Sequence, residues 1–561
     1  MLGHRTSEVR MFDESFAFPS SLLGPVPAAP RGTGGPGGPD GTGAGSGAAD
    51  GGRVRGAVVG GGIAGLVTAY ELQRRGFDIV VYERLDRPGG RVRTHRFWDG
   101  TYADLGAMRV PENHHCVLHY VRAFGLPTRP FVNANPDAYY HLRGHRVRIH
   151  QAGTLDSVYA LGAGERGAPL DVLDGLLRAV WAALGTDQQR HLLEGRWDDP
   201  ALERLATVSL WQYVHERISP DAWQLLGHAS GLAHYEQSCL LEVLVDYFGL
   251  FHLGQVELVG GMDTLVQAFV RALRPGTLRV STRIDELALT GTGVRIGGRR
   301  LGHRISELFD FAVCCVPVPA LDRIDVRPAL PHHQQHAVRG ISYASSTKAL
   351  VHTRRRSWEL RDGVFGGGSF TDMPIQQCWY PSDNARPGAG GGPVNGNGAG
   401  PANGDGRRPR YRLVAVDPDR SHAPAVLTGA YLWGASARRF TTLPPADRDL
   451  LVLKCLERLH PRIRDDVDDI VHWNWDDQIG PGGGAFAHLA PGEHGRYLVG
   501  LGTPHPAADP RIWFAGEHLS AAHAWMQGAA QSALGVVLRV LERWPHRGGE
   551  QAAPARVGSR P

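Results

Sequence analysis

Three glycines at fixed spacing give the first chemical signal in the chain. Gly60, Gly62 and Gly65 form the pattern G-x-G-x-x-G after a short apolar run. In this pattern the first glycine allows a tight turn, the second lets the backbone approach a pyrophosphate, and the third lets a helix pack closely on a strand. Glu83 follows at the spacing where a carboxylate accepts hydrogen bonds from a ribose diol. These residues predict a dinucleotide site, with a solvated strand end as the alternative for Glu83.

The elements that must hold these residues are indicated by the same stretch. Residues 57–59 predict a buried strand, 63–75 a helix that Gly76 ends, and 78–83 a second strand. Together they predict a βαβ unit whose helix N-terminus offers free N–H groups to a phosphate. Farther along, the pattern is mostly helical from 155 to 246, short strands return after 279, and the last clear helix covers 526–543.

Further motifs carry a resemblance to a known family. The turn RPGGRVRT at 87–94 follows Glu83 closely, and the segments WFAGEH at 513–518 and HAWMQGA at 523–529 lie near the C-terminus. In this order they resemble the signatures of the flavin amine oxidase family, over about residues 57–543. The segment GAMRVP at 106–111 resembles the L-amino acid oxidase branch of that family, whose members use FAD.

The resemblance implies the amine oxidase fold, of the α/β class. It implies a Rossmann-like FAD-binding domain, a mixed-sheet α+β substrate domain and an inserted helical subdomain. We expect the FAD-binding domain at 54–98, 255–328 and 486–545. The substrate domain is expected at 99–150, 246–254 and 329–485, with a flexible loop at 383–410, and the helical subdomain at 151–245. Residues 1–53 and 546–561 are expected to be disordered, because Gly, Pro and Ala dominate 24–52 and the tail is polar.

The resemblance also implies which residues contact the cofactor. Arg91 is expected to meet the diphosphate charge, and the N-terminus of the last helix is expected to point at the isoalloxazine ring. No motif for a His-linked or Cys-linked flavin is present, so noncovalent FAD is expected. The expected contacts are Gly60, Gly62, Ala64, Gly65, Glu83, Arg84, Gly89, Gly90, Arg91, Met108, Arg109, Val280, Gly516, Glu517, Trp525 and Met526.

Four residues are expected on the substrate side. By resemblance, Arg109 binds a substrate carboxylate through its guanidinium fork, the Tyr431 hydroxyl contacts the same carboxylate, and Trp525 forms a wall around the amine. The alternatives are a surface arginine and a core tyrosine. Ala524 departs from the family, where glycine is usual, and adds a methyl group beside the expected substrate cavity.

Lys348 is the expected catalytic residue. It resembles the family lysine that holds a water against flavin N5, where an ammonium group assists proton or oxygen chemistry. Lys348 and Lys454 are the only lysines in the chain, so a lysine at this place stands out against the many arginines. A solvated strand lysine is the alternative.

The implied reaction is oxidative deamination of an L-α-amino acid to the 2-oxo acid, with ammonia and hydrogen peroxide released. A histidine of the helical region, His228 or His234, could assist deprotonation. Three alternatives stay open: an amino acid 2-monooxygenase that forms the amide, an oxidase of amines or polyamines, and a flavin-stabilised binding protein without catalysis. The sequence does not identify the side chain of the substrate, although a large apolar or aromatic one is favoured.

The composition limits the classes of molecule that the protein is expected to bind. The net charge of +4 over 561 residues gives no reason to expect nucleic acid or an acidic membrane surface. Six cysteines without paired spacing indicate neither a disulfide framework nor a metal site. The N-terminus has no signal-peptide run and no long uncharged stretch follows, so we expect a cytoplasmic protein. The expected partners are an amino acid and O₂, and the resemblance favours a homodimer.

Overall fold

The computed structural model describes residues 53–545 except 236–237, 252–253, 389–411 and 478–482. The segments expected to be disordered, 1–53 and 546–561, therefore lie outside the described residues apart from Arg53. Most of the loop expected at 383–410 lies outside as well. Its described beginning is not a free loop, since strand β20 (Ala385–Pro387) pairs with β21 (Leu413–Ala415) and Asp383 lies 2.6 Å from Arg356 in an ion pair.

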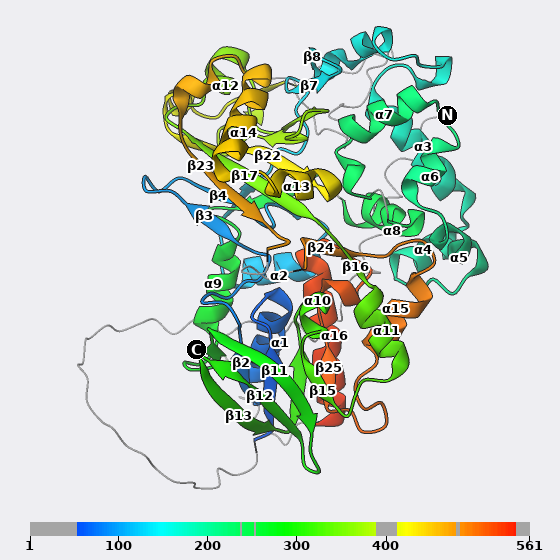
Figure 1. The fold of residues 1–561 in the computed structure, drawn as a ribbon, viewed down its shortest axis with the longest axis vertical. Helices are drawn as coiled ribbons and strands as arrows, with labels where there is room; N and C mark the ends of the chain where they lie inside the picture. Colours follow the sequence, from blue (N-terminus) through cyan, green and yellow to red (C-terminus); the bar gives the residue numbers. More distant parts are fainter. Residues whose placement is uncertain (1–52, 236–237, 252–253, 389–411, 478–482, 546–561) are drawn as a thin grey trace, which may run out of the picture.

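A five-stranded parallel sheet forms the base of the molecule (Figure 1). Its order is β10-β2-β1-β14-β25, and all four pairings are parallel. Both faces are covered, which is why most residues of its strands are apolar. The strands are β1 (Arg55–Val59), β2 (Asp78–Tyr82), β10 (Leu278–Arg279), β14 (Phe311–Cys314) and β25 (Ile512–Phe514).

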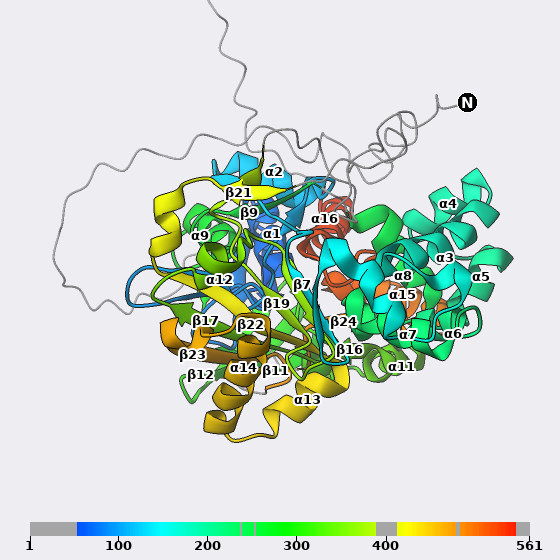
Figure 2. The same ribbon diagram turned by 90° about the horizontal axis from the view of Figure 1, so that it is seen from above.

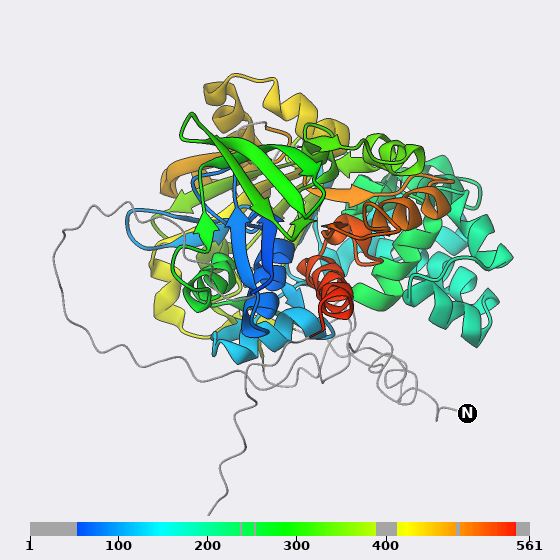
Figure 3. The ribbon, with the colours of Figure 1, turned by 90° about the horizontal axis from the view of Figure 1, so that it is seen from below.

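Helices pack on one face of this sheet through Val58 and its neighbours of the same orientation. Figure 3 shows α1 and α16 side by side on this face. The helices are α1 (Ile63–Arg74), α2 (His115–Ala123), α9 (Asp263–Ala272) and α16 (Met526–Arg543). Strand β1, helix α1 and strand β2 confirm the predicted βαβ unit with small shifts at the ends, and α16 confirms the last predicted helix.

Ala57 and Val59 point to the opposite face, where a second core joins the parallel sheet to a four-stranded sheet and three helices. The four-stranded sheet has the order β13-β12-β11-β15. These elements are β11 (Thr282–Leu289), β12 (Val294–Arg300), β13 (His303–Phe309), β15 (Asp325–Arg327), α10 (Val318–Leu321), α11 (His332–Gly340) and α15 (His494–Gly502).

A seven-stranded sheet, in the order β23-β17-β22-β19-β18-β7-β8, lies above the parallel sheet in Figure 1. It is mixed, because β18 and β7 run parallel whereas the other pairs are antiparallel. Helices α12, α13 and α14 share its core. The elements are β7 (Tyr139–Leu142), β8 (His145–Arg148), β17 (Ser346–Thr353), β18 (Gly368–Thr371), β19 (Gln377–Trp379), β22 (Ala425–Trp433), β23 (Val467–Asn474), α12 (Ser357–Asp362), α13 (Gly434–Thr441) and α14 (Pro445–Leu459).

The helices between 155 and 246 gather at one side of the molecule (Figure 2). The sequence at 201–218 has helical apolar spacing throughout, yet it forms two helices, α5 and α6. The Ser209 hydroxyl accepts the N–H of Gln212 and starts the second helix. The helices are α3 (Pro169–Ala183), α4 (Thr186–Leu193), α5 (Pro200–Ala206), α6 (Leu210–His215), α7 (Pro220–Ala229), η3 (Leu232–Tyr235) and α8 (Leu240–Val245), which runs into the π-helical turn η4 (Asp246–Leu250).

Short strands connect the part built on the parallel sheet, the part built on the seven-stranded sheet and the group of helices between 155 and 246. They are β3 (Thr94–Arg96), β4 (Tyr102–Asp104), β5 (Val110–Pro111), β6 (Thr128–Pro130), β9 (Gln255–Leu258), β16 (Ser342–Ala344) and β24 (Phe486–His488). Because β5 pairs with β9, the segment 106–111 is held beside the end of η4. Over the described residues, every helix is too short or too polar to span a bilayer.

Candidate active site

One cavity of about 600 Å³ runs from the glycine turn after β1 to the helices α3 and η3. Residues from both ends of the chain meet there, and Gly65 and Val280 are the two predicted site residues outside its lining. The predicted residues that line it are Gly60, Gly62, Ala64, Glu83, Arg84, Gly89, Gly90, Arg91, Met108, Arg109, Lys348, Tyr431, Gly516, Glu517, Ala524, Trp525 and Met526.

The glycine turn has the geometry that the sequence motif predicts. Gly60 has a φ of +109°, which residues with a side chain rarely adopt, and its N–H donates to the Tyr82 carbonyl across 2.8 Å. Gly62 borders the cavity at the start of α1, and a Cβ there would meet nothing within 4 Å. A Cβ on Gly65 would lie 1.9 Å from the Gly60 carbonyl oxygen. Gly65 therefore acts through close packing of α1 on the turn.

Glu83 is fixed at the edge of this turn. Its two carboxylate oxygens accept the N–H groups of Gly61 and Leu85, each across 2.8 Å. The residue is 8% exposed, which excludes a solvated strand end. Burial raises the pKa of Glu83, and the carboxylate borders the cavity beside the glycine turn.

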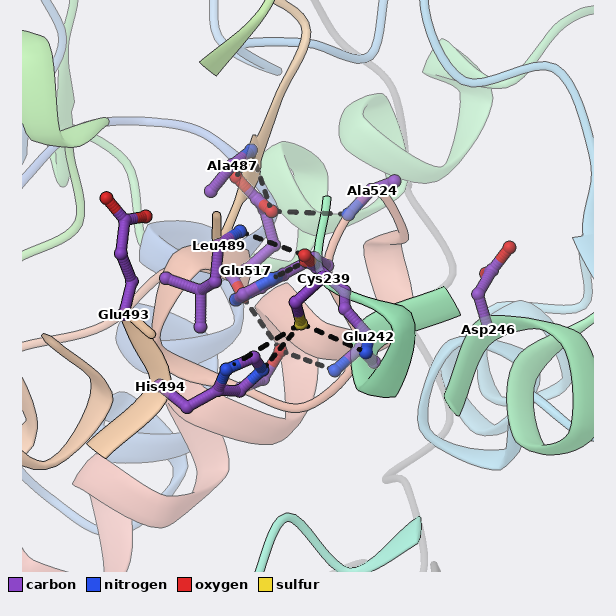
Figure 4. A network of polar contacts seen from close by, with 12 residues as sticks. Cys239, Glu242, Asp246, Ala487, Leu489, Glu493, His494, Glu517 and Ala524 are labelled. Atoms are coloured by element: carbon purple, nitrogen blue, oxygen red, sulfur yellow. Dashed lines mark hydrogen bonds and ion pairs between the residues drawn. The ribbon is translucent and has the colours of Figure 1, made fainter. Parts of the chain in front are cut away.

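Arg91 has a carboxylate partner inside the protein. Its guanidinium lies 2.6 Å from Glu517 in an ion pair and also donates to the Ala485 carbonyl. Figure 4 shows Glu517 accepting the backbone N–H groups of Ala487 and Ala524 as well. This buried network ties the turn at 87–94 to β24 and to the segment before α16. The charge of Arg91 is thus balanced by Glu517 within the protein.

Lys348 is buried, and it forms part of the cavity lining. Its ammonium donates to the carbonyl oxygens of Asp104 and Gly106, at 2.9 and 2.8 Å, and lies 3.5 Å from Met108 Sδ. Burial lowers the pKa of Lys348 and raises the pKa of the neighbouring Asp104 carboxyl. The residue is 1% exposed, so a solvated strand lysine is excluded.

Arg109 stands in an aromatic box on the same cavity. The guanidinium carbon lies 5.5 Å from the ring centres of both Phe131 and Phe251 and 5.2 Å from that of Trp379. One nitrogen donates to the Asn133 side chain across 3.1 Å. Among the described residues no carboxylate forms an ion pair with Arg109. Desolvation lowers the pKa of its guanidinium, so the charged form is less favoured than in water. The charge of Asp246 offsets this effect in part, and an anion that entered the cavity would offset it further.

Tyr431 lies next to Lys348 in the cavity lining. Its ring centre lies 4.6 Å from the Lys348 ammonium and 4.6 Å from the ring centre of Trp433. Burial raises the pKa of the Tyr431 hydroxyl, and the positive charge of Arg109 opposes this rise. Tyr431 and Arg109 line the same cavity.

Trp525 closes the cavity from the start of α16. Its indole N–H donates to Asp246 across 2.6 Å, and the Tyr235 hydroxyl donates to the other oxygen of the same carboxylate across 2.8 Å. The His114 ring stands edge-on to the indole at 4.9 Å. Asp246 also lines the cavity, and burial raises the pKa of its carboxyl.

Ala524 has a φ of +67°, a left-handed conformation that favours glycine. Its methyl group borders the cavity next to Trp525, as expected from the sequence. The glycine that is usual at this place would adopt the same backbone without strain. The departure from the family thus adds both bulk and a local conformational cost.

The two candidate histidines do not join this group. His228, on α7, is outside the cavity lining, and the His234 side chain lies outside the described part of the structure. Sequence reasoning missed Asp246, His114, Asn133 and the aromatic box of Phe131, Phe251 and Trp379. One signal was available for Asp246: an acidic residue directly follows the buried apolar run LLEVLV.

Comparisons with known proteins agree with this architecture. A family model described as flavin containing amine oxidoreductase matches residues 63–541. An L-amino-acid oxidase of Vipera ammodytes ammodytes is 27% identical over 84% of this chain and 89% of its own length. A flavin-dependent L-tryptophan oxidase of Lentzea aerocolonigenes is 30% identical over 85% of this chain and 95% of its own.

Solved structures of two amine oxidases show the same fold. Cyclohexylamine oxidase from Brevibacterium oxydans has a TM-score of 0.64 at 17% identity, over 88% of this chain and all of that one. Wild-type putrescine oxidase bound to putrescine has a TM-score of 0.63 at 18% identity, over 88% of this chain and 99% of that one. The expected amine oxidase fold is confirmed. With the family match over most of its length, the chain belongs to the flavin-containing amine oxidoreductases.

Proposed function

We propose that this protein is an FAD-dependent oxidase that deaminates an L-α-amino acid to the 2-oxo acid, releasing ammonia and hydrogen peroxide. The observation that carries the proposal is Arg109. This cation is partly exposed to the cavity, and it forms an ion pair with no carboxylate partner among the described residues. A substrate carboxylate would supply that partner through two parallel hydrogen bonds.

The residues at the other end of the cavity fit noncovalent FAD. The open backbone at Gly62, the fixed carboxylate of Glu83 and the N-terminus of α16 would hold phosphate, ribose and flavin groups respectively. We also propose that the backbone of Val280 contacts the adenine, since Thr282, two residues farther on, lines the same cavity. FAD bound there would supply the hydride acceptor and pass the electrons to O₂.

The residues of the chain would position the substrate. Arg109 and Tyr431 would hold the carboxylate, and Trp525 would form one wall beside the amine. Lys348 is held by two carbonyl groups, which fixes its nitrogen for proton or oxygen chemistry. Positioning of this kind lowers the entropic part of the barrier.

The remaining lining favours a large apolar or aromatic substrate side chain. Beyond Arg109 the cavity is bordered mainly by aromatic and aliphatic groups, including Tyr140, Ile149, Leu173, Phe370 and Trp379. Such surfaces bind apolar groups through removal of both surfaces from water. The name of the L-tryptophan oxidase among the relatives supports the same side-chain class.

Two alternatives share parts of this site. An oxidase of plain amines would share the fold with cyclohexylamine oxidase and putrescine oxidase, but it would leave Arg109 without an anion. An amino acid 2-monooxygenase would use the same carboxylate contacts and release an amide, so the two differ in product.

The test compares substrates that differ only in the carboxylate. Purified yellow protein is given L-tryptophan or L-phenylalanine and, as matched controls, tryptamine or phenethylamine, with peroxide, ammonia and 2-oxo acid measured together. The proposal expects equal amounts of the three products from the amino acids and none from the amines. Amide in place of 2-oxo acid would indicate the monooxygenase. Activity with the amines alone, or no bleaching of the flavin by any proteinogenic L-amino acid without oxygen, would contradict the proposal.

A further inference from the structure

The cavity holds one acidic group at its substrate end. Four carboxylate residues line the cavity: Glu83, Asp246, Asp285 and Glu517. Glu83 borders the glycine turn, Asp285 lies on β11, and Glu517 is paired with Arg91. Asp246 is the one of the four that lies beside Trp525, where the substrate amine is proposed to sit.

The Asp246 carboxylate is held rigidly but keeps room for another donor. Trp525 donates to Oδ1 and Tyr235 donates to Oδ2, so the plane of the carboxylate is fixed. Each carboxylate oxygen has two lone pairs, and among the described residues each receives one hydrogen bond. One acceptor position on each oxygen therefore remains for a group that enters the cavity.

The local fold aims this residue inward. At Asp246 helix α8 gives way to a π-helical turn, closed by the Phe251 N–H bonded to the Asp246 carbonyl across 2.7 Å. Such turns are rare and concentrate at functional sites. The turn places Asp246 against the indole of Trp525 and Phe251 against the guanidinium of Arg109.

The groups around Asp246 affect its affinity for a proton in opposite directions, Glu242 raising and Arg109 lowering the pKa of its carboxyl. Arg109 faces it from the segment before β5, Tyr235 from η3, and Glu242 from the preceding turn of α8. A small second cavity, lined by Asp246, Glu242 and His523, separates it from the Glu242–His523 ion pair. Figure 4 shows Asp246 apart from the network around Glu242. Burial raises the pKa of the Asp246 carboxyl, and Arg109 opposes that rise.

We propose that Asp246 binds the α-ammonium group of the substrate and is the base that deprotonates it. This inference rests on the proposed function. An N–H bond of the ammonium breaks, an O–H bond forms on an Asp246 oxygen, and the nitrogen keeps the electron pair. No electron is lost or gained in this step. The neutral amine can then release a hydride from Cα, which the ammonium cannot. Asp246 and Arg109 thus recognise the two charges of a zwitterionic amino acid.

The test is the rate of anaerobic flavin reduction against pH, for the wild type and for Asp246→Asn. The asparagine keeps an acceptor for Trp525 but cannot take a proton. In the wild type we expect reduction to be almost independent of pH from neutral to weakly basic conditions. In Asp246→Asn we expect a loss of about 10²-fold at neutral pH, the usual contribution of a general base. That rate should recover about tenfold per pH unit, since only free amine from solution reacts.

Asp174→Asn is the matched control. Asp174 accepts a tyrosine hydroxyl, that of Tyr247, across 2.7 Å in the same helical region, but it does not line the cavity. Its pH profile should match that of the wild type. An unchanged profile in Asp246→Asn would overturn the inference, and so would a loss confined to amino acids with nitrogen in the side chain.

The wild-type profile keeps the inference testable if Asp246→Asn does not fold with flavin. A wild-type rate that rises about tenfold per pH unit would show that the amine enters neutral, and would overturn it. Failure of the proposed function looks different, because no amino acid would then reduce the wild-type flavin at any pH.

Discussion

Lys348 and Tyr431 face each other across the strands β17 and β22, and the ammonium of Lys348 lies 4.6 Å from the centre of the tyrosine ring. One cross-strand pair therefore joins the proposed catalytic lysine to the proposed carboxylate-binding tyrosine. A cation over an aromatic face is stabilised by roughly 1–2 kcal/mol when water is excluded. The seven-stranded sheet sets the distance between these two functions.

Replacing Lys348 with methionine tests its role in the chemistry. Methionine keeps an unbranched side chain that is one atom shorter, and it removes the charge and the donors to the Asp104 and Gly106 carbonyls. We expect a slower reduction or reoxidation half-reaction with FAD still bound, because the glycine turn and Glu83 are untouched. Stopped-flow absorbance of the flavin separates the two half-reactions. Rates equal to the wild type in both would remove Lys348 from the mechanism.

Replacing Arg109 with alanine should weaken the use of amino acids. Leaving a substrate carboxylate unpaired costs about 2–5 kcal/mol, by comparison with other buried charge pairs. At about 1.4 kcal/mol per tenfold, kcat/KM should fall by at least one order of magnitude. Arg109→Lys should recover part of this loss, because an ammonium keeps the charge without the fork. Unchanged steady-state kinetics for Arg109→Ala would refute the assignment.

Two identical substitutions at different glycines should have opposite effects. Gly65→Ala puts a methyl group 1.9 Å from the Gly60 carbonyl oxygen, so the turn must move and flavin binding should be lost. Gly175 lies exposed within α3 with nothing within 4 Å, so alanine there should stabilise the helix by about 0.5–1 kcal/mol. Flavin content and urea denaturation measure the two effects. A fully yellow Gly65→Ala protein would show that close packing at this turn is dispensable.

Two buried histidines should contribute a loss of stability between about pH 6.5 and pH 4. Burial lowers the pKa of both His494 and His518 to about 4, whereas their ordinary value is 6.5. In this window the unfolded chain binds a proton at each histidine and the folded chain does not, so their contribution to the free energy of unfolding decreases as the pH falls. The raised pKa values of Glu257 and Asp104 contribute in the opposite direction. His494→Gln should reduce the slope by about 1.4 kcal/mol per pH unit in urea denaturation. A difference in stability between wild type and His494→Gln that stays constant from pH 7 to pH 5 would contradict this prediction.

The parts that sequence reasoning predicted are those encoded locally. The glycine motif, helix α1 and Glu83 lie within one short segment, so spacing alone relates them. The contact between Asp246 and Trp525 joins residues 279 positions apart and depends on how α8 meets α16. The box around Arg109 likewise combines Phe131, Phe251 and Trp379 from separate elements. The periodicity of apolar residues carries no information on such long-range contacts, because tertiary packing decides them.

The break at Ser209 shows the same limit on a smaller scale. The apolar spacing at 201–218 continues across both helices, and only the capping hydrogen bond from Gln212 reveals where the second begins. A serine in a helical pattern is compatible with either an interior or a cap. The end of such a helix therefore follows from the packing of the chain around it.

The π-helical turn at Asp246–Leu250 contains one residue more than an α-helical turn would need. Each residue of an α-helix rotates the chain by about 100°. Loss of a single codon in this segment would therefore restore an ordinary α-helix. The side chain of Asp246 would then be rotated about the helix axis, away from Trp525. In descendants of this gene, an acid at the substrate end of the cavity could be gained or lost by an insertion or a deletion, with every remaining amino acid unchanged.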